Sequence, residues 1–139
     1  MFAKNLEHVL AEALGKSDVS PIDLADIAER FESLRGYGRL PRGRANRATP
    51  LSSSETAAAI LGLVASNAKW AGHAVAIIGD LRPVGGAGVA FHGVANLSAA
   101  IECLLNDSGA RDGLVSLTVS AAESAINCNG DLVPDLRTV

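Results

Sequence analysis

The strongest constraint on the fold of this chain is a helix start at Ser52 that is followed by an apolar run. Ser52 and Glu55 have the S-x-x-E spacing of a capping box, in which two side chains and two backbone amides bond reciprocally. The residues that then recur at helical spacing are Ala57, Ile60, Leu61, Val64 and Ala68. Because Ala57–Ala59 and Leu63 make most of the remaining surface apolar, we predict that this helix is central in a helical domain.

Helical periodicity predicts two helices before this one. Residues 2–14 form an amphipathic helix that ends at Gly15, and its inward face is Phe2, Leu6, Val9, Leu10 and Ala13. The next helix is expected to begin with Ser20 as N-cap, Pro21 at the first helical position and Asp23 closing a pattern like a capping box. Its buried stripe is Leu24, Ile27, Ala28, Phe31 and Leu34.

Two further helices are predicted in the second half of the chain. One covers residues 68–81, with an apolar side of Trp70, Ala74, Ile77, Ile78 and Leu81. The other covers residues 98–106, with Leu97, Ile101, Leu104 and Leu105 on one side. Between them, residues 82–96 contain Pro83 and several glycines, so this segment is interpreted as a loop.

Near the end of the chain the apolar residues recur at every second position. Val115, Leu117 and Val119 alternate with polar residues, which is typical of a half-buried strand, and Ser124–Cys128 is its predicted hairpin partner. A lone hairpin is marginally stable in water, so it must pack on the helices or on another subunit. The expected fold is mainly α, with a C-terminal β-hairpin (α+β).

Length and composition favour one small domain. The chain has 139 residues, 48% hydrophobic and 19% charged, which is enough apolar material for a core and too little charge for a disordered chain. No apolar run approaches the length of a membrane span, and the first residues lack the apolar stretch of a signal peptide. We therefore expect a cytoplasmic protein with no membrane partner.

Charge divides the chain into two parts. Residues 1–70 carry nine basic and eight acidic residues (+1), whereas residues 71–139 carry three and seven (−4). Five arginines fall within thirteen residues that contain no acid: Arg35, Arg39, Arg42, Arg44 and Arg47. Glycine and proline in this basic loop, residues 35–50, forbid a continuous helix and predict an exposed loop. We expect residues 1–66 to bind a polyanion and residues 67–139 to serve packing and oligomerisation.

The stretch from Leu34 to Ala65 resembles a known group of small proteins. The matching pattern is Leu34-Arg35-x-x-Gly38-x-Leu40-Pro41-x-Gly43-Arg44, Ala48-x-Pro50-Leu51-Ser52 and Glu55-Thr56-Ala57-Ala58-Ala59-x-Leu61. It is similar to small helix-turn-helix or winged-helix-like proteins of alphaproteobacteria and their prophages. That resemblance implies a DNA-binding or regulatory role, with the basic loop after the recognition helix.

The candidate site is therefore the basic loop. The residues expected to contact the DNA backbone or a narrow minor groove are Arg35, Tyr37, Arg39, Arg42, Arg44, Asn46 and Arg47. Tyr37 is expected either to stack on a base or sugar or to anchor the loop to the preceding helix. Two alternatives stay open for the arginines, namely an acidic protein partner and a merely solvated loop. The acids of residues 21–34 would be repelled by phosphates, so we expect that helix to support the loop rather than enter the groove.

Other segments give no catalytic or cofactor pattern. The glycine-rich residues 83–90 lack the Lys-Ser/Thr of a phosphate loop, and His8, His73 and His92 have no metal-ligand spacing. Cys103 and Cys128 are interpreted as reduced core thiols. We expect a non-enzymatic protein without cofactor, metal or small-molecule substrate, acting as a homodimer or higher oligomer, because DNA readers of this size often dimerise.

Overall fold

The computed structural model describes residues 1–15, 22–42, 50–85, 91–121 and 128–134. Its helices are α1 (Ala3–Gly15), α2 (Leu24–Gly36), α3 (Ser53–Leu61), α4 (Ala71–Ile78), α5 (Leu97–Asn106) and α6 (Ser108–Asp112), and its strands are β1 (Leu114–Ala121) and β2 (Cys128–Pro134). Short 3-10 turns cover Gly62–Val64, Ala68–Trp70 and Phe91–Gly93. The prediction of a mainly helical chain with a C-terminal hairpin is confirmed.

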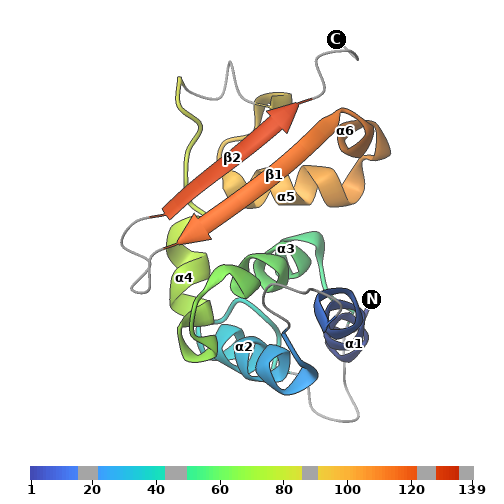
Figure 1. Ribbon diagram of the computed structural model, residues 1–139, viewed down its shortest axis with the longest axis vertical. Coiled ribbons are helices and arrows are strands. Elements are labelled where there is room, and N and C mark those ends of the chain that lie inside the picture. The colour runs from blue at the N-terminus through green and yellow to red at the C-terminus, as the bar shows by residue number, and fades with distance from the viewer. Residues whose placement is uncertain (16–21, 43–49, 86–90, 122–127, 135–139) are drawn as a thin grey trace.

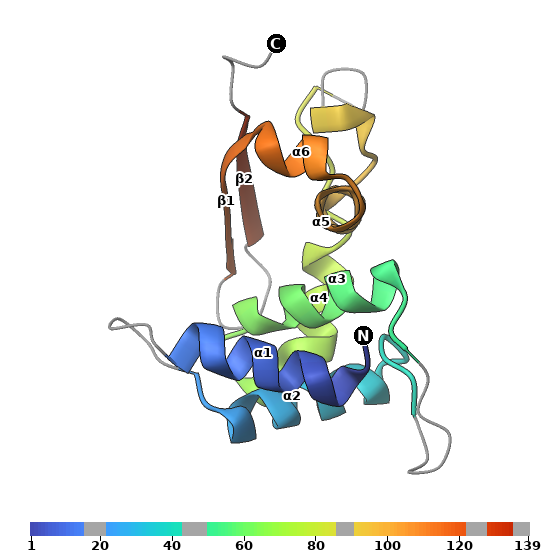
Figure 2. The ribbon, with the colours of Figure 1, turned by 90° about the vertical axis from the view of Figure 1, so that its right-hand side faces the viewer.

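The elements form a stack along the long axis of the molecule (Figure 1). Helices α1 and α2 lie at one end, α3 and α4 occupy the middle, and α5, α6 and the hairpin lie at the other end. In the perpendicular view the hairpin is seen edge-on beside α5 (Figure 2). Helix α3 packs against α2, α4 and α5 and is thus the central helix that its apolar sequence predicts.

The start of α3 is the predicted capping box. The Ser52 hydroxyl accepts from the Glu55 amide at 3.1 Å, and the Glu55 carboxylate accepts from the Ser52 amide at 2.9 Å. This reciprocal pair satisfies two of the backbone amides that have no partner inside the helix. Ala57, Ala59 and Leu61 are buried against the neighbouring helices, so the local signal and the tertiary packing agree.

The predicted start of α2 is wrong. The N-cap is Asp23, whose carboxylate accepts from the Asp26 amide at 2.8 Å while its own backbone is extended. Asp23 therefore takes the capping role assigned to Ser20, and the helix begins at Leu24; Ser20 and Pro21 lie outside the described residues. The residues that α2 buries completely are Ile27, Phe31 and Leu34.

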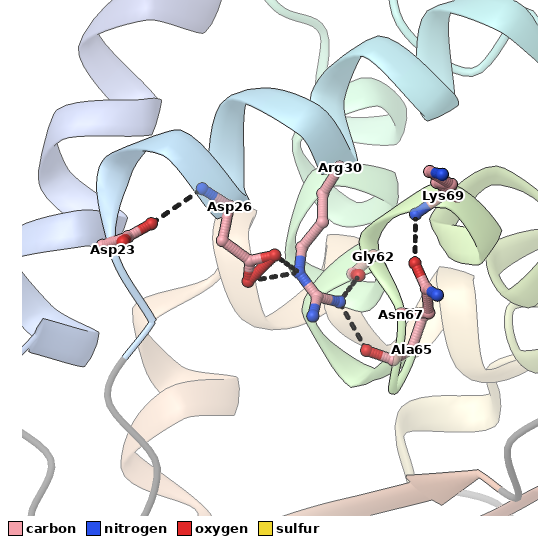
Figure 3. Close-up of polar contacts among 7 residues, drawn as sticks. All are labelled: Asp23, Asp26, Arg30, Gly62, Ala65, Asn67 and Lys69. Atoms are coloured by element: carbon pink, nitrogen blue, oxygen red, sulfur yellow. Dashed lines mark hydrogen bonds and ion pairs between the residues drawn. The ribbon is translucent and has the colours of Figure 1, made fainter.

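Arg30 is the buried cation of α2 (Figure 3). It is 5% exposed, and its Nη1 donates to the carbonyl oxygens of Gly62 (2.9 Å) and Ala65 (2.5 Å). Its Nε pairs with the Asp26 carboxylate at 3.2 Å. Buried polar groups are stabilising only when they are paired, and this guanidinium satisfies two carbonyls left free where α3 ends. Arg30 thereby ties α2 to the turn between α3 and α4.

Helix α1 buries a narrower face than its periodicity predicts. Leu6 is buried and Leu10 is half-buried, but Phe2 and Val9 are exposed. Within the described residues α1 packs mainly on α2, so only the residues on that side of the helix are covered.

The predicted helix over residues 68–81 is present in two pieces, a 3-10 turn and α4. Trp70 does not join the buried side as predicted but is 53% exposed, because it stands in the 3-10 turn before α4 begins. Ala74 and Ile78 are buried as predicted. The predicted 98–106 helix is confirmed as α5. Helix α6, capped by the Asp107 carboxylate, was not predicted.

Strand β1 is confirmed, but its predicted partner is wrong. The partner is β2, which begins at Cys128, the last residue of the predicted segment, and runs to Pro134; residues 122–127 lie outside the described part. Leu117 pairs with Leu132, and Val119 with Gly130. Leu117, Val119 and Leu132 pack against the core.

Candidate nucleic-acid interface

The basic loop leaves α2 through a defined turn. Gly38 has a φ of +72°, and its amide donates to Arg35 O at 3.1 Å while the Arg39 amide donates to Leu34 O at 2.9 Å. This pair of bonds is a Schellman motif, in which glycine takes the left-handed conformation that a side chain disfavours. Leu40 then inserts into the core, so the chain is fixed on both sides of Arg39.

Arg39 and Arg42 are the exposed arginines of this turn. Within the described parts of the chain neither of them forms an ion pair. Their charges are therefore available to an external anion. The backbone that carries Arg39 is held by α2 and Leu40, so an incoming phosphate meets a cation whose main chain is already placed.

Arg35 has a different environment. Its guanidinium lies 3.3 Å from a Glu32 carboxylate oxygen and 3.9 Å from one of Glu7, and its side chain is 24% exposed. Its charge is shared with two carboxylates, one of them on α1. Arg35 thus helps to join α1 to α2 and is less available to a phosphate than Arg39 or Arg42.

Three of the predicted site residues, Arg44, Asn46 and Arg47, lie outside the described residues. The described part of the predicted site is therefore Tyr37, Arg39 and Arg42, which are exposed, and Arg35, which is held in an ion pair. This part lies at the C-terminal end of α2, and the sequence continues from it into the remaining arginines.

An aromatic cluster beside this turn was missed by sequence reasoning. Tyr37 and Trp70 are 51% and 53% exposed, and their ring centroids lie 6.3 and 6.1 Å from that of His73. These separations are typical of paired aromatic rings. We call Tyr37, Trp70 and His73 the aromatic platform. The residues are far apart in sequence, and only the packing of α2 on the start of α4 brings them together.

The acids of α2 divide into two groups. Asp23 caps the helix and Asp26 pairs with Arg30, so both are engaged in the fold. Glu29 and Glu32 line a shallow hollow of about 390 Å³ together with Tyr37 and Lys69, and Glu32 also pairs with Arg35. The expectation that this helix supports the loop from behind stays a prediction. Glu29 and Glu32 border the aromatic platform.

A polar cleft of about 730 Å³ also borders Arg39. Its walls include Arg39, Ala76 and Asp80, together with the first turns of α3 and α5. Glu55 in this cleft is already committed to the capping box. With Asp80 as a second acid, the described lining of the cleft has no excess of positive charge.

No protein-family model matches the chain, and no curated protein or solved structure matches it either. Within the described ranges, no helix combines the length and the apolar character needed to cross a membrane. Nor do the residues placed by the structure include a group of three or more His, Cys, Asp or Glu side chains that could hold a metal ion.

Proposed function

We propose that the protein binds DNA through the basic loop and acts as a non-enzymatic regulator or accessory protein. The observation that supports this most is the exposure of Arg39 and Arg42 on a backbone fixed by the Schellman turn and Leu40. Arginine without an ion pair on a preformed turn is well suited to phosphate oxygens, since its planar fork donates to two oxygens at once. Arg44 and Arg47 extend the positive charge along the sequence.

In this proposal the helical N-terminal part is a scaffold of helix-turn-helix or winged-helix type. The segment between α2 and α3, residues 37–52, is longer than the three- or four-residue turn of a helix-turn-helix motif. The proposal therefore assigns DNA contact to this segment rather than to α2, whose outer surface carries Glu29 and Glu32. Self-association through the C-terminal hairpin remains part of the proposal, because a two-stranded sheet has open edges.

A second candidate function is a protein-interaction module. Exposed Tyr, Trp and Arg side chains are the residue types that dominate binding energy at protein interfaces, and Tyr37, Trp70 and Arg39 lie around one end of α2. An acidic protein partner would satisfy the arginines equally well. DNA binding is preferred because a repeating phosphate chain can engage several arginines that are spread over residues 35–47 of the sequence.

The test is the affinity for a fluorescently labelled random-sequence duplex, measured by anisotropy. We expect the wild-type chain to bind, and the double variant Arg39→Ala/Arg42→Ala to bind at least tenfold more weakly with an unchanged circular dichroism spectrum. A charge-matched control, Lys4→Ala/Arg82→Ala, removes two other exposed cations and should bind like the wild type. No binding by the wild type, or equal losses in both double variants, would contradict the proposal.

A further inference from the structure

The aromatic platform is built on a tight junction between α2 and the start of α4. The Ser33 hydroxyl donates to Lys69 O at 2.9 Å and accepts from the Gly72 amide at 3.0 Å. The Tyr37 ring lies against Gly72, since a Cβ atom there would fall 2.5 Å from Tyr37 Cδ2. The platform therefore rests on a polar bond pair and on a glycine that permits close approach.

The exposure of two large rings on such a base is not explained by packing. Folded proteins usually cover aromatic side chains, which dominate the energetics of cores and interfaces. Tyr37 and Trp70 are each about half exposed although their backbone is held by α2, Ser33 and the 3-10 turn. Each ring meets His73, and the Tyr37 ring also lies against Gly72, yet about half of each residue's surface is exposed. A rigid, half-exposed ring loses little entropy when a flat ligand stacks on it.

The charges around the platform indicate the kind of ligand. Lys69 directly precedes Trp70, and Arg39 follows Tyr37 by two residues, and both cations are exposed. Glu29, Glu32 and Lys69 line one hollow beside Tyr37, so the charge of Lys69 is offset there and a polyanion is disfavoured on that side. A ligand that stacks on the rings while its negative backbone lies on the side of Arg39 fits this arrangement. Single-stranded nucleic acids are bound by this combination of aromatic side chains and cations.

We propose that the platform stacks an unpaired nucleobase, so that the preferred ligand is DNA with a single-stranded stretch beside the site of the basic loop. This inference rests on the proposed function, because Arg39, two residues after Tyr37, and Arg42 supply the phosphate contacts of that proposal. In fully paired DNA the base faces are covered by their neighbours, and the rings have nothing to stack on. Unstacked bases in single strands present both faces.

The chain offers a direct spectroscopic probe, because Trp70 is its only tryptophan. A base that stacks on Trp70 quenches the intrinsic fluorescence, whereas phosphate contacts at the loop leave it unchanged. The ligands are a random-sequence duplex and the same duplex with a single-stranded tail of about ten thymidines. Quenching of Trp70 by the tailed duplex alone is expected, together with about tenfold tighter binding of the tailed form.

Variants separate stacking from a structural role. Trp70→Ala should bind the tailed duplex about tenfold more weakly and the plain duplex as the wild type does, whereas Trp70→Phe should keep most of the preference. Phe2→Ala, which removes an exposed ring directly before α1, is the matched control and should change neither affinity. Unfolding temperatures within error of the wild type show that the fold is retained.

The possible failures are distinguishable. Equal affinity for the two ligands with unchanged Trp70 fluorescence overturns the stacking inference and leaves the proposed function standing. Absence of binding to both ligands overturns both. Quenching that persists in Arg39→Ala/Arg42→Ala, at reduced affinity, supports two separate contacts, one to the base and one to the phosphates.

Discussion

The ring of Tyr37 lies directly on the backbone of Gly72. A side chain at position 72 has no room, because its Cβ would fall 2.5 Å from Tyr37 Cδ2 and 2.7 Å from the Ser33 carbonyl oxygen. Gly72 is buried, and its amide is bonded to Ser33. This contact fixes the end of α2 against the start of α4 and with it the position of the aromatic platform.

Gly72→Ala should therefore destabilise the fold and displace Tyr37. We expect a loss of about 2 kcal/mol in the free energy of unfolding, in the range of overpacked core positions, because the Tyr37 ring and the Ser33 carbonyl oxygen both block the new methyl group. Urea denaturation measures this. Gly36→Ala, at a helical glycine with open space around its Cβ, is the control and should be neutral or slightly stabilising. A stable Gly72→Ala variant would show that the junction is looser than described.

Arg30 should be a stability determinant and not a ligand contact. Arg30→Ala leaves the carbonyl oxygens of Gly62 and Ala65 without their donor, and we expect a loss of about 3 kcal/mol. Arg35→Ala breaks more exposed ion pairs and should cost at most about 1 kcal/mol. Chemical denaturation of both variants gives the comparison. Equal losses would contradict the role assigned to the buried guanidinium.

The capping box at the start of α3 should contribute less to the free energy of unfolding than Arg30 does. Ser52→Ala removes the acceptor of the Glu55 amide, and we expect a loss of about 1 kcal/mol. Ser54→Ala, two residues further along the chain and inside the helix, should change the stability by less than about 0.5 kcal/mol. Thermal unfolding followed by circular dichroism is sensitive enough for this difference. If both serines behave alike, the cap contributes nothing specific.

The two faces of the hairpin should contribute differently to the free energy of unfolding. Leu132→Ala should cost about 2 kcal/mol, because Leu132 packs on the core, whereas Val133→Ala on the exposed face should be nearly neutral. If self-association uses the hairpin, Val115→Lys/Val133→Lys should lower the mass measured by light scattering from dimer to monomer. A wild-type chain that is monomeric at every concentration would remove self-association from the account.

Local signals in the sequence predicted the elements whose ends are set by nearby residues. Ser52 with Glu55 located α3, and alternation around Leu117 located β1. The predicted start of α2 is wrong because the sequence offers two capping residues, Ser20 and Asp23, within four positions. The predicted partner of β1 is wrong because strand pairing depends on which residues meet the core. Leu132, which packs on the core, lies beyond the predicted segment.

The candidate site was predictable only in part for the same reason. A run of arginines without acids is visible in the sequence, but the pairing of Arg35 with Glu7 depends on how α1 packs on α2. The aromatic platform required the meeting of residues from α2 and α4. The sequence signal for the exposure of Trp70 is Asn67. Its side chain caps a 3-10 turn that contains Trp70, so Trp70 does not belong to the buried face of the following α-helix.

The most direct test of the central claim is the salt dependence of duplex binding. Each phosphate contact contributes about 0.9 to the slope of log affinity against log salt concentration. If Arg39 and Arg42 each contact a phosphate, the slope for Arg39→Ala/Arg42→Ala should be smaller than that of the wild type by about 1.8, while the slope for Lys4→Ala/Arg82→Ala stays unchanged. Identical slopes for the wild type and the Arg39→Ala/Arg42→Ala variant would contradict the assignment of the DNA contact to this loop.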